Sequence, residues 1–254
     1  MTPQLWSLPY SPWSEKAKWA LEDSGVHYEK QRYEPLLGEP ALRWRTGKWR
    51  GPVSVPVLHT DDGWLTDSFE IARWASARAP GSTLMPDAEL DRVRAYNELS
   101  ERGLAAGRAR SLARLLESRA GLRDMVPPKM RGVLGSLAVP VAAFGVRRTL
   151  RKYARTVDGD AARELTDVLD RLRADLAASG ARTRGVAHLL SHFSYADVAM
   201  AQVLAFVDPP ATHLRLTDAT RATFRDAELA PRYEDLLQWR DELYRELRDR
   251  PPAD

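Results

Sequence analysis

Residues 10–21 read YSPWSEKAKWAL, and they follow a run, Gln4–Leu8, in which polar and apolar residues alternate. Alternation of this kind is typical of a strand, and the proline-rich turn that follows breaks it. From Trp13 onward, apolar residues recur every three or four positions until Gly25, which is a helix stop signal. The stretch therefore predicts a strand, a sharp turn and a helix of about three turns.

Ser11 stands at the junction of the predicted strand and helix. Serine is a preferred N-cap, and Pro12 suits the first helical position. The Ser11 hydroxyl would then lie beside unpaired backbone N–H groups and the positive end of the helix dipole, where an anion is favourable. The local sequence leaves two interpretations open: Ser11 only caps the helix, or it also belongs to an anion-binding site.

The rest of the first 78 residues also mixes strand and helix patterns. Residues 34–52 are irregular, with several glycines and clusters of tryptophan and arginine, so we expect a loop that holds at most a short helix. Strand patterns cover Val26–Tyr33, Val53–Thr60 and Trp64–Thr66, a hairpin turn lies at Asp61–Gly63, and helical spacing covers Asp67–Ala77.

Strand patterns disappear after residue 78. Residues 79–87 contain two proline-rich turns and predict a linker. Beyond them, apolar stripes with helical spacing occur around residues 90–116, 165–176, 196–203 and 233–247. We therefore expect an α/β domain over residues 1–78, a linker over 79–87 and an all-helical domain over 88–254.

Composition excludes several classes of protein. The chain has 38 Lys and Arg against 35 Asp and Glu, a net charge of +3, with both signs mixed along most of it, so no nucleic-acid partner is expected. It has no cysteine, which excludes disulfides and thiolate metal sites. Met1–Leu8 lacks a secretory signal pattern, so we expect a cytoplasmic protein.

Two histidines, His188 and His192, stand four residues apart and would meet on one face of a helix as metal ligands do. No Glu-x-x-His context or third ligand accompanies them. We therefore interpret them as surface histidines and predict no metal site.

Residues 10–21 resemble the active-site turn and first helix of glutathione transferases. The resemblance implies the glutathione-transferase fold, which is an α/β thioredoxin-like N-terminal domain followed by an all-α C-terminal domain. The first residue of the family's turn contacts the glutathione sulfur, and that position is Ser11. Ser11 and Ser14 stand where redox-active relatives carry a cysteine pair, so no disulfide exchange is expected.

A second segment, Val53–Leu58, resembles the family's Val-Pro element. By this resemblance Pro56 is cis, and Val55 offers backbone hydrogen bonds to the cysteinyl part of glutathione. From the residues alone, Pro56 also fits an ordinary proline at the start of a strand.

A third segment begins at Asp67 and Ser68, which match the pair that holds the γ-glutamyl end of glutathione. The same residues also fit a capping box, with Asp67 as N-cap and Glu70 reaching back. The two interpretations are compatible, because a helix start suits both. Lys48, or alternatively Arg45, would pair with the glycine carboxylate of glutathione.

A fourth segment, Phe193–Ala199, is similar to the capping motif of the family's central C-terminal helix. Ser194 and Asp197 have the spacing of a capping box. We interpret this motif as a determinant of folding.

The resemblance implies an enzyme that adds the thiolate of glutathione, as co-substrate, to an apolar electrophile without a metal. Ser11 would stabilise the thiolate, and the chain would form a homodimer. Two alternatives remain: a non-catalytic protein of the same fold that serves in binding or assembly, or a glutathione-dependent isomerase or peroxidase.

Residues 123–157 fit the family pattern least. Gly132–Val146 is a nearly uncharged run that contains Pro140 and has basic residues on both sides. It is too short to span a bilayer, which takes about 20 residues. Three interpretations are open: a lid over an apolar substrate site, a peripheral membrane contact through residues 129–152, or a buried helical pair.

Overall fold

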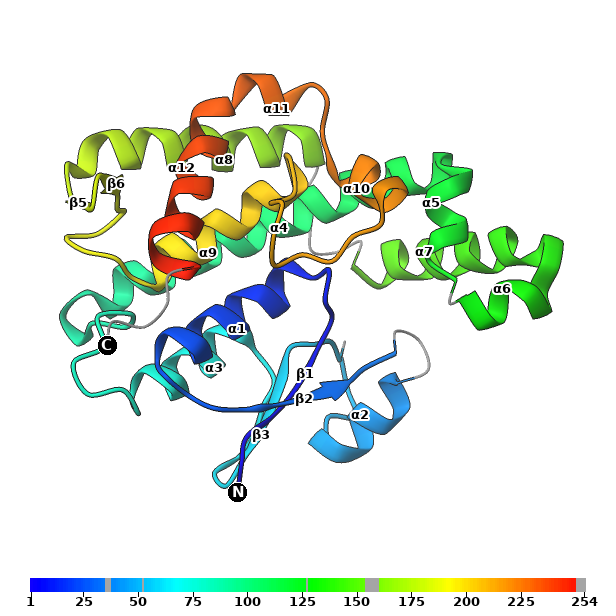
Figure 1. The fold of residues 1–254 in the computed structure, drawn as a ribbon, viewed down its shortest axis with the longest axis horizontal. Coiled ribbons are helices and arrows are strands. Elements are labelled where there is room, and N and C mark those ends of the chain that lie inside the picture. The colour runs from blue at the N-terminus through cyan, green and yellow to red at the C-terminus, as the bar shows by residue number, and fades with distance from the viewer. Residues whose placement is uncertain (35–37, 52, 127, 154–159, 250–254) are drawn as a thin grey trace.

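The computed structural model describes residues 1–254 except 35–37, 52, 127, 154–159 and 250–254. A small sheet with its helices forms one half of the molecule, and long helices form the other (Figure 1). Helix α1 lies between the sheet and the long helices, and α5, α6 and α7 extend to one side as a projection.

The sheet is mixed and has the strand order β2-β1-β3-β4. β1 pairs in parallel with β2 and antiparallel with β3, and β4 pairs antiparallel with β3. The strands are β1 (Gln4–Ser7), β2 (Glu29–Arg32), β3 (Val57–Thr60) and β4 (Gly63–Leu65).

Both faces of this sheet are covered. Successive strand residues point to opposite faces, so Leu5 packs with α1 and α3, where Ile71 lies, whereas Trp6 packs with Leu42 of α2 on the other face. The three helices are α1 (Pro12–Asp23), α2 (Glu39–Thr46) and α3 (Ser68–Ser76).

The second half of the chain is built around α4, α8 and α9, which enclose the main hydrophobic core. The long helices are α4 (Leu90–Glu117), preceded by the short turn η1 (Asp87–Glu89), α7 (Ala138–Tyr153), α8 (Ala161–Ser179), α9 (Tyr195–Val203) and α12 (Glu234–Leu243). The shorter elements are α5 (Arg119–Asp124), α6 (Pro128–Leu134), η2 (Gly135–Leu137), β5 (Arg182–Thr183), β6 (Val186–Ala187), η4 (Leu204–Phe206), α10 (Asp218–Phe224), α11 (Leu229–Arg232) and the π-helical turn η5 (Tyr244–Arg248).

Two glycines of α4 allow the segment of α9 and η4 to approach closely. A Cβ atom added to Gly103 would lie 2.7 Å from Val203 Cγ1, and one added to Gly107 would lie 2.6 Å from Phe206 Cβ. Both distances are far inside van der Waals contact, so the packing of these elements requires glycine at both positions.

The elements expected in the first half are confirmed, with three corrections. The strand expected over Val53–Thr60 begins only at Val57, where its pairing with Trp6 of β1 starts. The second strand covers only Glu29–Arg32, because Val26 and Tyr28 pack toward α1 and α3 before the ladder begins. The hairpin turn has two residues instead of three, because Gly63 already pairs with Thr60.

The irregular segment 34–52 contains the short helix α2, while residues 35–37 and 52 of this segment lie outside the described part. The stripes around residues 90–116 form one helix, α4, of 28 residues. In the described part of the second half, the regular elements are helices except for the two-residue strands β5 and β6, which the sequence patterns missed. The domain limits at 78 and 88 stay a prediction.

The close approach at Gly107 predicts a stability difference between two glycine replacements. Gly107→Ala would place its methyl group against Phe206, and we expect it to lower the free energy of unfolding by about 1–3 kcal/mol. Gly132→Ala, in α6, meets no atom within 4 Å and should raise it by about 0.5–1 kcal/mol through helix propensity. Urea denaturation of both variants measures the difference, and equal effects would contradict the packing argument.

Candidate functional site

The turn between β1 and α1 places Ser11 at the start of the helix. Ser11 is the N-cap of α1, as predicted, and its Oγ accepts a hydrogen bond from the backbone N–H of Ser14 at 3.3 Å. The Ser14 hydroxyl in turn accepts from the Leu8 backbone N–H at 3.1 Å, which ties the end of β1 to the helix. Ser11 is half-buried, and its hydroxyl stands at the positive end of the α1 dipole.

The segment before β3 contains the expected cis bond between Val55 and Pro56. Its position follows from the sheet register, because Trp6 of β1 lies opposite Val57 of β3 in an antiparallel pair. The residues before Val57 therefore lie beside the residues after Trp6. The Val55–Pro56 peptide thus lies at the edge of the sheet where β1 leads into the Ser11 turn.

Helix α3 begins at the same edge. β4 runs antiparallel to β3, with Leu65 opposite Leu58, so the chain after β4 returns toward Pro56. Asp67 caps α3 as predicted, and its Oδ1 accepts from the backbone N–H groups of Phe69 at 2.8 Å and Glu70 at 3.3 Å. The structure therefore brings the Ser11 turn, the cis peptide and the start of α3 to one edge of the sheet.

Two details at the start of α3 differ from the expected pattern. Glu70 does not take the expected part in a capping box, and its carboxylate lies 3.6 Å from Arg73 instead. The Ser68 side chain is enclosed, with 2% of the residue exposed, and its Oγ has no hydrogen-bond partner among the described residues. The Tyr195 hydroxyl, which interacts electrostatically with Ser68, is also buried without a partner there.

Lys48 lies in the loop after α2 and is exposed. Its backbone carbonyl accepts from Arg43, and no described contact ties its side chain to the Ser11 edge. The guanidinium of Arg45, the alternative residue, lies 5.6 Å from the ring centre of Trp6, on the face of the sheet that α2 covers. The role of either residue toward a ligand stays a prediction.

A buried polar cluster behind the turn was not found from the sequence. Lys16 of α1 is fully buried, and its Nζ donates to Asn97 Oδ1 at 2.7 Å, Ser100 Oγ at 3.1 Å and Glu101 Oε1 at 2.8 Å, all on α4. Trp13 donates to the other oxygen of Glu101 at 2.7 Å. This cluster fixes the first turns of α1, and therefore Ser11, against α4.

Electrostatics within this cluster favour the ion pair. Burial raises the pKa of Glu101, but the adjacent Lys16 ammonium outweighs this effect, and the pKa of the carboxyl falls below its ordinary value. The only sequence signal for the cluster is that charged residues stand within a helix whose other residues are largely apolar.

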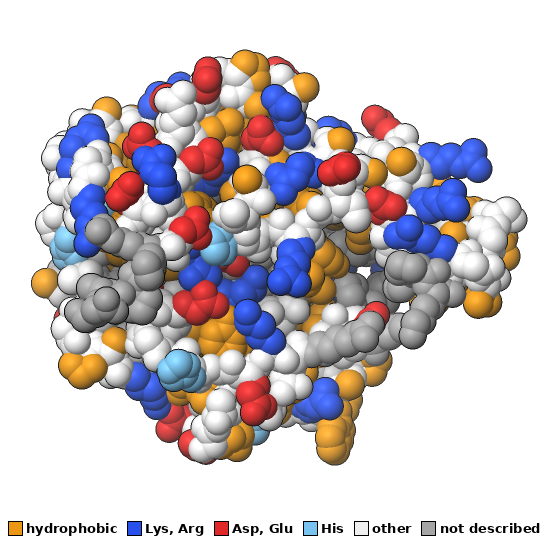
Figure 2. All heavy atoms as spheres, viewed as in Figure 1, with side chains coloured by type: hydrophobic (Ala, Val, Ile, Leu, Met, Phe, Trp, Pro, Cys, Tyr) orange, Lys and Arg blue, Asp and Glu red, His pale blue; other side chains and the backbone are white. Residues whose placement is uncertain are grey.

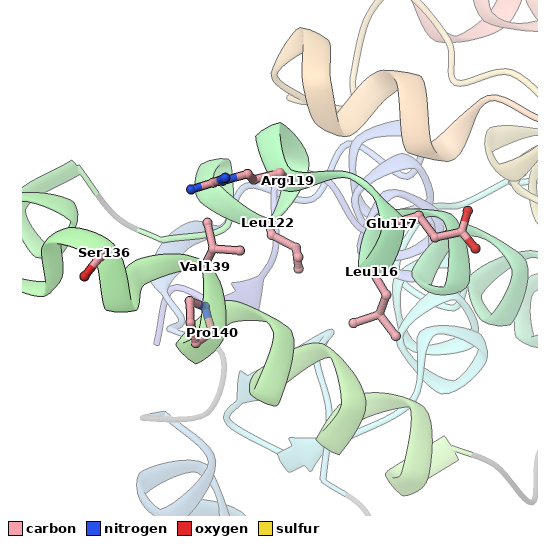
Figure 3. Close-up of a pocket in the computed structure, with 7 residues that line it drawn as sticks. All are labelled: Leu116, Glu117, Arg119, Leu122, Ser136, Val139 and Pro140. Atoms are coloured by element: carbon pink, nitrogen blue, oxygen red, sulfur yellow. The ribbon is translucent and has the colours of Figure 1, made fainter.

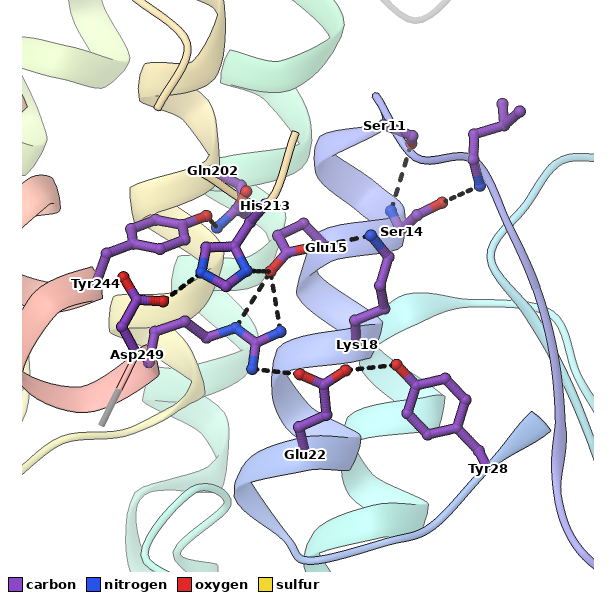
Figure 4. A network of polar contacts seen from close by, with 12 residues as sticks. Ser11, Ser14, Glu15, Lys18, Glu22, Tyr28, Gln202, His213, Tyr244 and Asp249 are labelled. Carbon is purple, nitrogen blue, oxygen red and sulfur yellow. Dashed lines mark hydrogen bonds and ion pairs between the residues drawn. The ribbon is translucent and has the colours of Figure 1, made fainter. Parts of the chain in front are cut away.

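A second network joins α1 to the C-terminal end of the described chain (Figure 4). Glu15, 1% exposed, accepts from Arg248 at 3.2 Å and from Lys18 at 3.0 Å. His213 lies 3.7 Å from the same carboxylate and also contacts Asp249. These bonds hold the last turn of the described chain over the middle of α1.

Aromatic and cationic side chains from three helices meet beside the turn. The guanidinium of Arg108, on α4, lies 4.7 Å from the ring centre of Trp13 and 3.8 Å from that of Tyr153, the last residue of α7. The turn itself is tied to the second half by a bond from the Arg215 backbone N–H to the Pro9 carbonyl. Residues from both halves of the chain therefore lie next to the Ser11 turn.

The capping box at the start of α9 is confirmed, with Asp197 Oδ2 accepting from the Ser194 backbone N–H at 2.9 Å. The interpretation of His188 as a surface residue is wrong, because it is fully buried 3.6 Å from Asp197. His192 is partly exposed and lies beside Glu89. In the described part of the chain, no three His, Asp or Glu side chains gather as metal ligands.

A pocket of about 410 Å³ lies in the projection (Figure 3). Its lining comes from the end of α4, from α5 and from the segment where η2 leads into α7, and it includes Leu122 and Val139. None of its lining residues belongs to the Ser11 edge, so it is not the site predicted from the sequence.

The buried cluster predicts an unequal effect of two lysine replacements in α1. Lys16→Met keeps the side-chain length but leaves Glu101, Asn97 and Ser100 without their cation, so we expect a loss of about 1–3 kcal/mol in the free energy of unfolding. Lys18→Met removes one pair with Glu15, which keeps Arg248, and should cost less. Equal losses in urea denaturation would contradict the structural role of Lys16.

The His188–Asp197 pair predicts a pH effect. Burial lowers the pKa of His188 to about 4, so its contribution to stability is lost as the pH falls from about 6.5 toward 4. Burial raises the pKa of Asp197 to about 7, so its contribution has the opposite sign and declines as the pH rises from about 4 to 7.

Asp197→Asn removes the titration of the Asp197 carboxyl and leaves that of His188. We expect the free energy of unfolding of Asp197→Asn to fall more steeply than that of the native protein as the pH is lowered from 6.5 to 4. Chemical denaturation at a series of pH values measures both slopes, and parallel slopes would refute the assignment.

Comparison with known proteins is consistent with this geometry. Residues 10–78 match the family model described as glutathione S-transferase, N-terminal domain. A search of curated proteins finds no significant match.

Solved structures resemble the chain over almost its full length. A glutathione transferase of Phanerochaete chrysosporium has 15% identity and a TM-score of 0.63, covering 100% of this chain and 99% of its own. The β-etherase LigF of Sphingobium sp. has 17% identity and a TM-score of 0.59, with coverage of 99% and 96%. A glutathione S-transferase of Methylobacillus flagellatus with glutathione bound has 17% identity and a TM-score of 0.53, with coverage of 96% and 95%.

At these identities the solved structures establish the fold, and the family model identifies the N-terminal domain. The predicted fold, a thioredoxin-like α/β domain followed by a helical region, is confirmed. Residues 10–78 thus match the glutathione S-transferase N-terminal domain, and the chain as a whole has the fold of solved glutathione transferases.

Proposed function

We propose that this protein binds glutathione along the edge of the sheet that carries Ser11 and transfers its thiolate to an apolar electrophile. The observation that carries the proposal is the sheet register, which gathers the Ser11 turn, the cis Val55–Pro56 peptide and the start of α3 at one edge. Two helices, α1 and α3, begin there, and helix N-termini favour the negative charges of a thiolate and of carboxylates.

Ser11 has the chemistry to stabilise a thiolate. The bond from Ser14 uses a lone pair of Ser11 Oγ and not its hydrogen, so the same hydroxyl keeps its donor for a sulfur anion. A free thiol has a pKa near 8.5, and lowering it by about two units takes roughly 2.7 kcal/mol. A hydroxyl donating to a charged acceptor contributes about 1.5–3 kcal/mol, and the helix dipole adds about 0.3–1 kcal/mol. These contributions suffice without a protein base.

The remaining predicted contacts hold the peptide. Val55 would bind the cysteinyl part through its backbone beside Pro56, and Lys48 would reach the glycine carboxylate. The exposed carboxylate of Asp67 suits the amino group of the γ-glutamyl end. Ser68 fits less directly, because its hydroxyl is enclosed and a ligand carboxylate would first meet the backbone at the start of α3.

The surroundings of the turn support an apolar co-substrate. The rings of Trp13 and Tyr153 both lie against the Arg108 guanidinium, next to the helix that Ser11 caps. Aromatic faces of this kind offer large apolar area to a bound molecule.

Conjugation, isomerisation and peroxide reduction all begin from the same thiolate, and the electrophile decides among them. A cytoplasmic location and a homodimer stay predictions.

The enclosed Ser68 hydroxyl favours one alternative, which is a non-catalytic protein that keeps the fold for binding or assembly. Calorimetric titration with glutathione separates the two proposals. A glutathione-using protein releases or absorbs heat that saturates with one site per chain, whereas a protein without the site gives only the heat of dilution.

Removing the Ser11 hydroxyl tests the mechanism. Ser11→Gly keeps most of the capping stability, because glycine is itself a tolerated N-cap, and it removes the donor. We expect kcat/KM for an aromatic halide with glutathione to fall roughly ten- to a hundredfold. Ser24→Ala, at the opposite end of α1, is the matched control and should retain the native rate. If Ser11→Gly turns over as fast as the control, Ser11 has no part in the chemistry.

A further inference from the structure

The charge of the chain is concentrated in one segment. Residues 119–153 contain eight Lys and Arg but a single Asp, a net charge of +7, whereas the whole chain carries +3. The other residues together therefore carry a net charge of −4. The segment forms the projection made by α5, α6 and α7, over which basic side chains gather in Figure 2.

Helix α7 has two different apolar stripes. The inner stripe contains Val146 and Ala143 and packs against the end of α4 and against α5, where Leu115 and Leu122 are buried. The outer stripe lies on the opposite side and is exposed. It begins at Leu137, the last residue of η2, and continues along α7 at intervals of three and four residues, as one face of a helix requires. Its apolar members Val141 and Phe144 are followed by the basic residues Arg148 and Arg151.

On α6, Met130 and Val133 are exposed as well. The exposed fraction is 88% for Val133, 62% for Phe144 and 60% for Leu137. Six of the nine large hydrophobic residues that are exposed in the described chain lie between Met125 and Phe144. We call Met130, Val133, Leu137, Val141 and Phe144 the apolar surface.

Several arginines of the projection have no countercharge among the described residues. Arg119 and Arg123 on α5, and Arg147 and Arg151 on α7, are exposed and form no ion pair with a carboxylate of the described residues. Two acidic residues that face the segment are already engaged: Asp124 lies 3.5 Å from Arg131, and Glu39 pairs with Lys152 at 3.1 Å and lies 3.9 Å from Arg148.

The geometry fits a position on a bilayer and not across it. By length and composition alone, the helical run Met130–Tyr153 is a candidate for a membrane span. However, Gly135, at a φ of +52°, breaks the run, and the inner stripe of α7 is already packed on α4 and α5. A span would also place Arg147 and Arg148 in hydrocarbon, where a charged side chain costs several kcal/mol.

We propose that the apolar surface docks on a membrane that contains anionic lipids, with Phe144, Leu137 and Val133 entering the interface and the flanking arginines meeting lipid phosphates. A helix face of this composition, apolar with basic flanks, binds at the boundary between headgroups and acyl chains. The opposite charge of the rest of the molecule orients the projection toward a negative surface. The interpretation as a buried helical pair thus holds for the inner stripe only. The proposal does not depend on glutathione binding.

Flotation with lipid vesicles tests the docking. The native protein should float with vesicles of phosphatidylglycerol and phosphatidylcholine in equal parts, and much less with pure phosphatidylcholine. Binding should weaken as salt is added, because screening acts on the arginine contacts. Equal recovery with both kinds of vesicle, or none with either, would overturn the proposal.

Two pairs of variants locate the contact. Leu137→Ser combined with Phe144→Ser should abolish flotation, whereas Trp44→Ser, at a residue 74% exposed on α2, should not. Arg147→Gln combined with Arg151→Gln should weaken binding by roughly fivefold for each charge removed. Arg163→Gln with Arg171→Gln on α8 is the matched charge control and should weaken it far less.

Two further measurements keep the result unambiguous. All substituted side chains are exposed, so thermal unfolding should show unchanged midpoints, which verifies the fold of each variant. Sedimentation then tests a second copy of this chain as the occupant. If the serine variant converts a dimer to a monomer and the native protein does not bind vesicles, the apolar surface is an interface between copies and the membrane proposal is wrong.

Discussion

The burial of helix α1 between the two halves of the molecule determines where everything else lies. Eight of its twelve residues are buried, including the charged residues Glu15 and Lys16. A buried charge is costly unless it is paired, so each of these side chains requires a fixed partner. Lys16 finds its partners on α4, and Glu15 finds Arg248 near the end of the described chain. Because Ser11 caps the same helix, the contacts that join the two halves also hold the candidate site in place.

Features that depend on a few neighbouring residues could be predicted from the sequence. The cap at Ser11, the cap at Asp67 and the box at Ser194 each consist of a side chain and backbone groups two or three residues away. Periodicity likewise located most of the long helices and most strands, but it did not predict the short helices α5, α10 and α11. The cis bond before Pro56 is different, because it was expected only through a family resemblance and not from the residues themselves. The gathering of the site at one edge then follows from the register of β1, β3 and β4.

Features that depend on distant residues could not be predicted. The hydrogen-bond partners of Lys16 lie 81 to 85 positions further along the chain, on α4, and nothing in the sequence of α1 indicates them. The burial of His188 depends on its place beside Asp197 at the start of α9, whereas the sequence indicated a surface residue only because no third metal ligand accompanied the two histidines. The enclosure of Ser68 similarly reflects packing around Tyr195, far along the chain. In each example, the local sequence pattern indicated the helix or strand, whereas contacts with distant residues determined which side chains are buried.

Helix α7 connects the apolar surface to the candidate site. Near its end, Lys152 donates to the Val53 carbonyl at 2.8 Å, two residues before the cis peptide begins. The next residue, Tyr153, stacks on Arg108, which in turn lies over Trp13 in the first turn of α1. The helix is therefore anchored on both sides of the Ser11 edge, although its outer stripe faces away from the core. Because a helix transmits displacement along its axis, any surface that holds the outer stripe also fixes the orientation of the site relative to that surface. The net charge of the whole chain is only +3 because the strongly basic charge of the projection is partly cancelled by the negative charge of the other residues.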